Sequence, residues 1–205
     1  MLFEDRADAG RRLGEALAKY KGEEVVVLAL PRGGVPVAAE VAKALHAPLD
    51  LIVARKIGHP HHPEYGIGAV TDDGYEVFNE GERRSVDPEW LQEEIRSQIK
   101  EAQRRREAYL GGRQSQNLAG KTAILIDDGI ATGYTLRAAI HSARARQAER
   151  IVVASPVAPR GTDLPEADDV VVLETPEDFR AIGSFYRDFE QTDDTQVKQL
   201  MENRL

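Results

Sequence analysis

The sequence has no cysteine and no long apolar run. The absence of cysteine among its 205 residues excludes disulfides, thiolate metal sites and a cysteine nucleophile. No apolar stretch approaches the roughly 18–20 residues of a membrane-spanning helix, and no signal peptide precedes the first amphipathic segment. We therefore expect a cytoplasmic protein without membrane attachment.

Positive charge is also scarce. The chain has 27 Lys and Arg against 35 Asp and Glu, a formal net charge of −8 at pH 7. This balance argues against general affinity for nucleic acid, so any anionic substrate has to be captured by local positive charge. The length suits one core, and no repeat or flexible linker is visible. We expect a single domain over residues 1–205, with a core over 20–175 and a small hood from 57–90 and 175–205.

The most informative stretch is residues 124–136, which read ILIDDGIATGYTL. Its apolar start predicts a buried strand, and the apolar residues that follow the stretch recur at helical spacing. The loop between them contains Gly129 and Gly133 and ends at a helix N-terminus, where free N–H groups and partial positive charge suit a phosphate monoester. The hydroxyls of Thr132 and Thr135 can donate to the same anion.

Two carboxylates, Asp127 and Asp128, stand directly before this loop. Carboxylates repel a phosphate, but they accept hydrogen bonds from the two hydroxyls of a vicinal diol. A phosphate cradle beside such acceptors therefore suits a sugar phosphate. The other interpretation is that the pair ends a strand and caps a helix, although adjacent acids at the exit of a buried strand are costly without partners.

A second strand–glycine loop–helix unit comes earlier in the chain. The apolar stretch 25–30 runs into Pro-Arg-Gly-Gly-Val-Pro, after which a helical pattern begins. Arg32 beside the free N–H groups of Gly33 and Gly34 indicates a second anion site. The alternative is a tight turn with a solvated arginine.

A third apolar stretch, 49–54, delivers Arg55 and Lys56 at its end. Two cations at the C-terminal end of a strand lie where open α/β sheets bind ligands. The alternative is that both are solvated.

These stretches alternate with helical patterns, which predicts right-handed crossovers and a sheet covered on both faces. We expect an α/β fold: a three-layer sandwich with a mainly parallel five-stranded sheet, a small hood, and a hairpin or flexible-loop insertion. The expected strands are 25–30, 49–54, 124–126, 151–154 and 170–173.

The segment 57–79 has a different character. It contains His59, His61 and His62, but flanking prolines and the lack of a fourth ligand at fixed spacing weaken a metal interpretation. Asp72-Asp73-Gly74 precedes an alternating stretch and indicates a hairpin turn.

A long helix is expected over 88–110. Its run Arg104-Arg105-Arg106 resembles a nucleic-acid patch, but such a run near a helix C-terminus more often forms a solvated face that complements the helix dipole.

The stretch 124–136 resembles the phosphoribosyl-pyrophosphate (PRPP) fingerprint of type I phosphoribosyltransferases: hydrophobic residues, two acids, a small-residue loop and Thr-Gly-x-Thr. The resemblance continues in chain order over roughly residues 20–185. It implies a pentosyltransferase that uses PRPP and Mg²⁺ to transfer phosphoribosyl to a small-molecule nitrogen acceptor, most simply a nucleobase in salvage, with release of pyrophosphate. It also implies a homo-oligomer, such as a homodimer, while the acidic charge balance argues against nucleic-acid partners.

The resemblance assigns roles to individual residues. Asp127, Asp128 and Lys56 would be catalytic, and Mg²⁺ would bridge pyrophosphate and ribose oxygens, with the two aspartates as its candidate protein ligands. A mobile loop over 57–79 would close over the substrate, with its histidines near pyrophosphate or a proton in transfer. Phe179, or else Phe185, would stack on the base. The ribose and 5-phosphate contacts would be Asp127, Asp128, Gly129, Ile130, Ala131, Thr132, Gly133, Tyr134 and Thr135. The pyrophosphate contacts would be Arg32, Gly33, Gly34, Arg55 and Lys56.

One position departs from part of the family. Hypoxanthine and guanine enzymes carry an acid where this chain has Ala131, so a base mechanism of that type is in doubt and the acceptor stays open. Three other functions compete with the transferase: a regulator that senses PRPP without catalysis, an RNA-binding attenuator, and a sugar-phosphate hydrolase.

Overall fold

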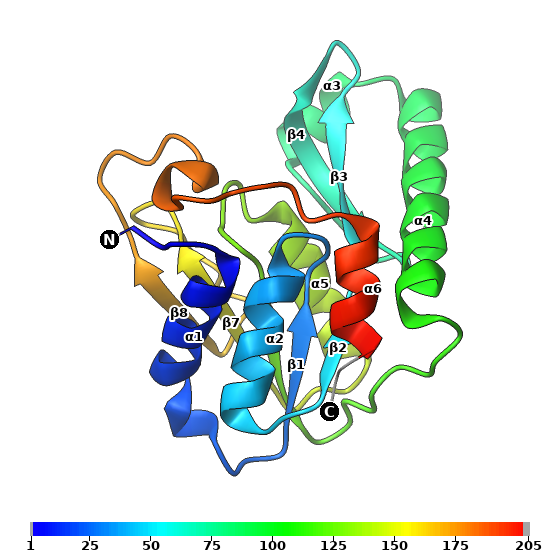
Figure 1. Cartoon of the computed structure of the whole chain (residues 1–205). Helices are drawn as coiled ribbons and strands as arrows, with labels where there is room; N and C mark the ends of the chain where they lie inside the picture. Colours follow the sequence, from blue (N-terminus) through cyan, green and yellow to red (C-terminus); the bar gives the residue numbers. More distant parts are fainter. Residues whose placement is uncertain (1, 203–205) are drawn as a thin grey trace.

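The computed structural model describes residues 2–202, which form a central sheet between helices and a projecting hood (Figure 1). The strands are β1 Val25–Ala29, β2 Leu49–Leu51, β3 Ala54–His59, β4 His62–Thr71, β5 Glu76–Phe78, β6 Thr122–Ile126, β7 Arg150–Val157 and β8 Asp169–Glu174. The α-helices are α1 Arg6–Ala16, α2 Gly34–Leu45, α3 Glu80–Ser85, α4 Pro88–Leu110, α5 Tyr134–Ala145 and α6 Asp194–Glu202. Short 3-10 turns cover Ala18–Tyr20 and Ile182–Phe185.

Five strands make an all-parallel sheet in the order β2-β1-β6-β7-β8. In the central pair, Val25 lies opposite Thr122 and Ala29 opposite Ile126, so β1 and β6 end at the same edge. Every residue of both strands is buried, which explains why their sequences are apolar without alternation. The loops after β1 and β6 therefore meet at the edge where open α/β sheets bind ligands.

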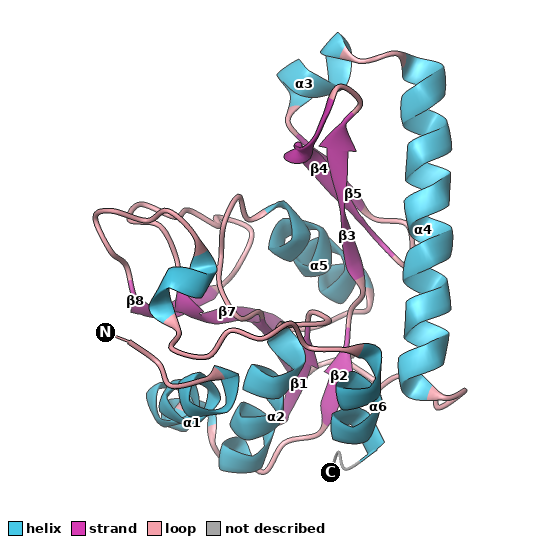
Figure 2. Ribbon diagram, turned by 45° about the horizontal axis from the view of Figure 1, so that its top comes forward, coloured by secondary structure: helices cyan, strands magenta, loops and turns pink. Residues whose placement is uncertain are grey.

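Helices cover both faces of this sheet. α1 and α2 pack on one face and α5 on the other (Figure 2). α6 lies beside α2 and α4 and closes the first of these two layers. The apolar stripe of α5 is buried against the sheet through Leu136, Ala139, Ile140 and Ala143.

The hood is a second, antiparallel sheet, β3-β4-β5, packed against α4. Asp87 caps α4 by accepting from the backbone N–H of Trp90 (2.8 Å), Pro88 occupies the first turn, and Gly111 ends the helix at φ 58°. The hood has its own apolar cluster, made by Ile57, Ile67, Val70, Val86, Leu91 and Ile95. It is thus tied to the main sheet but carries an independent small core.

The predicted fold class is confirmed, as are the helix over 88–110 and the hairpin turn at 72–74. The expected strand 49–54 is wrong in its second half: the parallel strand β2 ends at Leu51, and Ala54 already belongs to antiparallel β3. The insertion after it is a hairpin in place of an irregular loop. Closure of this insertion over the substrate stays a prediction, and so does the division of the chain into a single domain.

Within residues 2–202 no helix is both long and apolar enough to cross a membrane.

Candidate functional site

A cavity of about 180 Å³ opens at the carboxyl edge of the sheet, between the loop after β6 and the hood. The residues from Asp127 to Leu136 form its floor, Lys56 reaches it from β3, and Ile182 covers it from the C-terminal segment. The sequence predicted all of these contributors except Leu136 and Ile182. The structure therefore brings the acid pair, the small-residue loop and Lys56 together around one space.

The loop that lines this space is anchored to the sheet at its start and ends at the N-terminus of α5. The Ile130 amide donates to the carbonyl of Val157 (2.8 Å), which fixes the start of the loop to the neighbouring strand β7. Gly133 adopts φ 76° and is the N-cap of α5, so no side chain of the cap residue occupies the first-turn N–H groups. A helix N-terminus without a side-chain cap, beside a cavity, has the free N–H groups and partial positive charge that suit an anion.

The two acids have different environments. The Asp127 side chain accepts a hydrogen bond from the Asp128 amide (2.9 Å). Burial, followed by the nearby Asp128 charge, raises the pKa of Asp127 well above its usual value. Asp128 carries instead a direct ion pair with Arg6, whose Nε lies 2.7 Å from Oδ2. The two side chains thus differ: burial raises the pKa of Asp127, whereas Asp128 is held in an ion pair with Arg6.

Arg6 is a site residue that the sequence analysis missed. Its side chain and that of Asp128 are only 11% and 12% exposed. Arg6 also donates to the Glu190 carbonyl (2.7 Å) and stacks on the Phe189 ring at 3.9 Å. Tyr186 donates its hydroxyl to the Asp128 carbonyl (2.6 Å). The start of α1 and the C-terminal segment therefore clamp Asp128 from outside the cavity.

The Arg32 loop lies directly against the acid pair. A Cβ at Gly33 would collide with the Asp128 carboxylate, and one at Gly34 would stand 2.6 Å from the Ile126 carbonyl, so this approach requires glycine. The Pro31–Arg32 peptide bond is cis. The Arg32 guanidinium lies 3.5 Å from the Asp194 carboxylate at the start of α6, and Tyr109 donates to the same carboxylate oxygen (2.7 Å).

The two cations of β3 point in different directions. Lys56 lines the cavity and lies 3.8 Å from the Glu64 carboxylate, with 45% of its side chain exposed. Arg55 donates to the Gln98 side chain on α4 (2.7 Å) and does not line the cavity; its pyrophosphate contact stays a prediction. Neighbouring residues of a strand face opposite sides, so this difference between Arg55 and Lys56 was predictable from their adjacency in the sequence.

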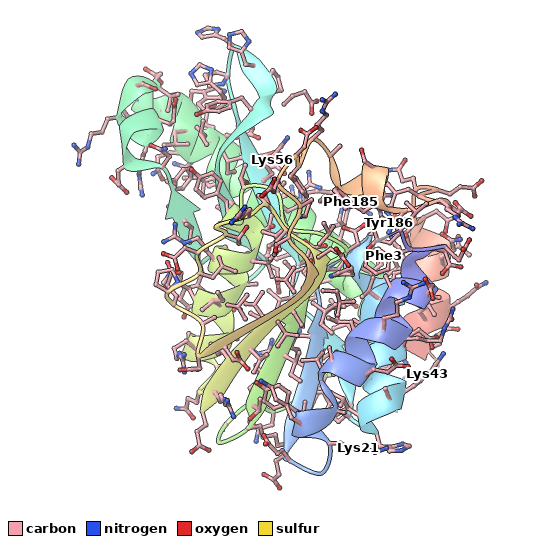
Figure 3. All side chains as sticks on the ribbon, turned by 90° about the vertical axis from the view of Figure 1, so that its left-hand side faces the viewer. Phe3, Lys21, Lys43, Lys56, Phe185 and Tyr186 are labelled. Atoms are coloured by element: carbon pink, nitrogen blue, oxygen red, sulfur yellow. The ribbon has the colours of Figure 1, made fainter. Side chains whose placement is uncertain are left out.

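The predicted aromatic contacts are also absent from the cavity lining. Phe179 and Phe185 stack on each other at 5.8 Å, and Phe185 joins the cluster around Phe3 and Tyr186 (Figure 3). The residue that lies over the loop is Ile182, whose side chain would meet a Cβ at Gly129. Ile182 follows a stretch without clear periodicity, so no pattern in the sequence singled it out.

The three histidines of the hood lie together. His59, His61 and His62 gather at the tip of the β3–β4 hairpin, with ring centroids 5.6 and 6.0 Å apart. Among residues 2–202, no three His, Cys, Asp or Glu side chains are placed to hold a metal ion.

The arginine run of α4 is paired within the protein. Arg104 and Arg105 bind Glu101, and Arg106 lies 3.3 Å from the Asp72 carboxylate. These three cations are thus engaged in ion pairs within the protein, and the side chains of Arg105 and Arg106 are only 24% and 20% exposed, so the expected solvated face holds for Arg104 alone.

Comparison with known families places this geometry in context. The model of the family described as "Phosphoribosyl transferase domain" matches residues 4–190. Curated proteins from two strains of Mycobacterium tuberculosis, provisionally named phosphoribosyl transferases, are 48% identical over 203 residues. That alignment covers 96% of this chain but 45% of the relatives, so the chain spans less than half of their length.

Solved structures are similar as well. The crystal structure of TT1426 from Thermus thermophilus is 39% identical, with a TM-score of 0.80 and 98% of both chains covered. A hypothetical protein from Neisseria gonorrhoeae, solved with bound ppGpp, shares the fold at 12% identity, with a TM-score of 0.53, 98% of this chain covered and 97% of that one.

Proposed function

Because this chain belongs to the phosphoribosyl transferase domain family, we propose that it transfers the phosphoribosyl group of PRPP to a nitrogen acceptor, with release of pyrophosphate. The observation that carries the proposal is the cavity in which the amide-rich loop, the acid pair and Lys56 meet. Few metabolites satisfy a monophosphate cradle, two hydroxyl acceptors and a cationic site at once. PRPP, a ribose with a 5-phosphate and a 1-pyrophosphate, does so.

Each part of the cavity has a role in this reaction. The amides of 131–135 at the start of α5 hold the 5-phosphate, and Asp128 accepts the ribose hydroxyls. Lys56 receives pyrophosphate at the cavity, and the Arg32 loop, which packs against Asp128 without lining the cavity, is the second proposed pyrophosphate contact. The new bond from the acceptor nitrogen to C1 forms as the C1–oxygen bond breaks, and the bonding pair leaves with pyrophosphate. The transition state has oxocarbenium character, so the protein acts mainly by orienting the sugar and stabilising the departing negative charge.

The donor set fits magnesium bound with the substrate. Asp127 and Asp128 are the acids at the cavity, and they form no three-ligand cluster with other described residues. Mg²⁺ commonly keeps several waters and uses one or two carboxylates plus substrate phosphates. When bound, it would neutralise charge on the pyrophosphate. Asp128 would hold it, and Asp127, whose side chain accepts from the Asp128 amide, would support that arrangement.

The test is pyrophosphate release from PRPP with a panel of purine and pyrimidine bases. We expect release that depends on both PRPP and one class of base, and that is lost in Asp128→Asn. Release without any base would indicate hydrolysis instead, and PRPP binding without release under any acceptor would indicate a PRPP-sensing regulator. The homo-oligomeric state and cytoplasmic location stay predictions.

A further inference from the structure

Arg6 connects the acid pair to a second cavity, which the proposed reaction does not use. Arg6 binds Asp128, which lines the cavity assigned to PRPP, while Arg6 itself lines a separate cavity of about 440 Å³. The first turns of α1 and α2, the helix α6 and the segment 188–192 form the walls, and this segment crosses the starts of α1 and α2 (Figure 1). The volume falls within the range of about 300–1,000 Å³ for small-molecule sites.

The lining of this second cavity carries an excess of negative charge. Asp5, Asp188 and Glu190 contribute three carboxylates, and none of them forms an ion pair with a cation of residues 2–202. Arg6 is the one cation among the lining residues, and it already donates to the Asp128 carboxylate and the Glu190 carbonyl. A cavity lined by one sign of charge concentrates ligands of the other sign, so this one favours a cation.

The placement of the carboxylates disfavours a bare metal ion. Within residues 2–202 no three His, Cys, Asp or Glu side chains are placed to hold one, so the positive charges have to be spread along a larger molecule. The lining also offers apolar surface from Pro36 in the first turn of α2 and from Leu200 on α6. Methylene segments can pack on such surface while the charged ends of the same molecule stay beside carboxylates.

A nearly enclosed hydroxyl adds a second pointer to a ligand. Thr192 lines the cavity and is only 5% exposed, yet its hydroxyl makes no hydrogen bond to another residue of 2–202. Buried polar groups normally have a partner. An ammonium group has donors and no acceptor, so it suits both this hydroxyl and the carboxylates.

We propose that this cavity binds a linear polyamine and that the bound polyamine raises the affinity of the protein for PRPP. Asp188 and Glu190 flank Phe189, whose ring stacks on Arg6, and the Glu190 carbonyl accepts from the same guanidinium. A ligand that bridges these carboxylates orders the segment that holds Arg6 against Asp128. The binding site goes beyond the proposed function, whereas its effect on PRPP rests on that function.

Calorimetric titration of the full chain with spermidine at low salt tests the site. We expect spermidine to bind, 1-aminobutane with its single charge to bind more weakly, and the dianion glutarate not to bind. The double variant Asp188→Asn/Glu190→Gln should weaken spermidine binding by about tenfold, and its asparagine can still accept from the Glu190 amide. Thr192→Val keeps the shape without the hydroxyl and should weaken binding by at least about threefold.

The matched control is Glu177→Gln/Asp178→Asn, which removes the same two charges outside this cavity. Both side chains are exposed and pair with Arg160 and Arg180, so spermidine binding should be unchanged. A wild-type protein that does not bind spermidine at millimolar concentration overturns the site. Equal loss of affinity in the two double variants overturns it as well, because it would show a response to overall charge alone.

The affinity for PRPP gives the second readout. Spermidine also associates with the PRPP anion in solution, and Asp188→Asn/Glu190→Gln is the reference for that effect. We expect spermidine to tighten PRPP binding about fivefold more in wild type than in this reference, and an equal change overturns the coupling. If spermidine binds but PRPP with Mg²⁺ causes no thermal shift in wild type, the proposed function falls while the polyamine site stands.

Discussion

At the residue scale, the Arg6–Asp128 pair links the stability of the site to its chemistry. The two side chains are almost fully enclosed and lie 2.7 Å apart. Breaking a buried pair by removing one partner typically costs about 3–5 kcal/mol, because the other charge is left without compensation. Arg6 does not line the cavity, so we expect it to act as a positioning residue for Asp128, the carboxylate that we propose accepts the ribose hydroxyls.

We predict that Arg6→Gln lowers the melting temperature and raises the KM for PRPP more than it lowers kcat. Arg6→Lys should restore part of the affinity, since a cation returns without the planar fork. Arg12→Gln is the control: Arg12 pairs with Asp8 on the surface of α1, and surface pairs are worth about 0–1 kcal/mol. Thermal denaturation and steady-state kinetics measure both effects, and an Arg6→Gln variant that matches the control would contradict the positioning role.

Asp127 gives a second prediction, because its pKa is raised by burial and by the Asp128 charge. The folded state then binds a proton more tightly than the unfolded state, so wild-type stability falls as pH rises from the ordinary carboxyl range through the raised value. Asp127→Asn removes this pH-dependent loss of folding stability, and the asparagine Oδ1 can still accept the hydrogen bond from the Asp128 amide. We expect the variant to be more stable than wild type at neutral pH, with an advantage that disappears in acid, and to lose activity.

The control is Asp168, whose pKa is shifted in the opposite direction to that of Asp127. Asp168 accepts from the Ile151 amide (2.7 Å), and this bond is the largest favourable cause of a lowered pKa at Asp168. Its stabilisation is present above the ordinary carboxyl range and is lost as pH falls, so Asp168→Asn should be less stable than wild type at neutral pH. Melting curves over a pH series test both, and an Asp127→Asn variant that is less stable at every pH would refute the assigned burial cost.

At the element scale, two loop–helix units are placed side by side by the pairing of β1 with β6. The Arg32 loop is close enough to the acid pair that a side chain at Gly33 would meet Asp128. The contact between the two loops thus depends on glycine at position 33, which has no Cβ to collide with Asp128.

We predict that Gly33→Ala displaces Asp128 and abolishes the thermal shift caused by PRPP and Mg²⁺. Gly81→Ala is the matched control, since a Cβ at Gly81, within α3, would meet Asn79 Oδ1 at 3.2 Å, and alanine favours a helix. Circular dichroism should show that both variants fold. A Gly33→Ala variant with an undiminished PRPP shift would show that the two loops do not cooperate.

Elements that are local in the sequence were predictable, and those joined by tertiary contacts were not. The strand, acids, loop and helix of 124–136 are contiguous, so composition and spacing suffice to identify them. Arg6 meets Asp128 across 122 positions, and Tyr186 and Ile182 arrive from the far end of the chain. No local pattern encodes such contacts. The different directions of Arg55 and Lys56 could have been predicted from the sequence, because neighbouring residues of a strand point to opposite faces.

At the scale of the whole molecule, α6 brings an acid to the pyrophosphate loop. Asp194 at its start lies 3.5 Å from Arg32 and also accepts from Tyr109. Burial, helped by this hydrogen bond, raises the pKa of Tyr109 to about 12. The C-terminal helix, the hood helix α4 and the Arg32 loop thus meet at one carboxylate, which, under the proposed function, would compete with pyrophosphate for Arg32.

We predict that Asp194→Asn tightens pyrophosphate binding, though by no more than about fivefold, since a partly exposed pair contributes about 0–1 kcal/mol. Asp193→Asn serves as the control, because Asp193 accepts from the Gln196 amide (2.8 Å) at the same helix start. Calorimetric titration with pyrophosphate and Mg²⁺ measures both variants. Weaker binding in Asp194→Asn would show that Asp194 orients Arg32 instead of competing for it.

The central claim is that one cavity holds the 5-phosphate, the ribose hydroxyls and the pyrophosphate of a single molecule. Calorimetric titration of the protein with PRPP, ribose 5-phosphate and pyrophosphate, each with Mg²⁺, tests it most directly. We predict that PRPP binds more tightly than either half by at least about tenfold, because linked groups bind with high effective concentration, and that Asp128→Asn removes this advantage. PRPP that binds no more tightly than pyrophosphate alone, or not at all at millimolar concentration, would contradict the account.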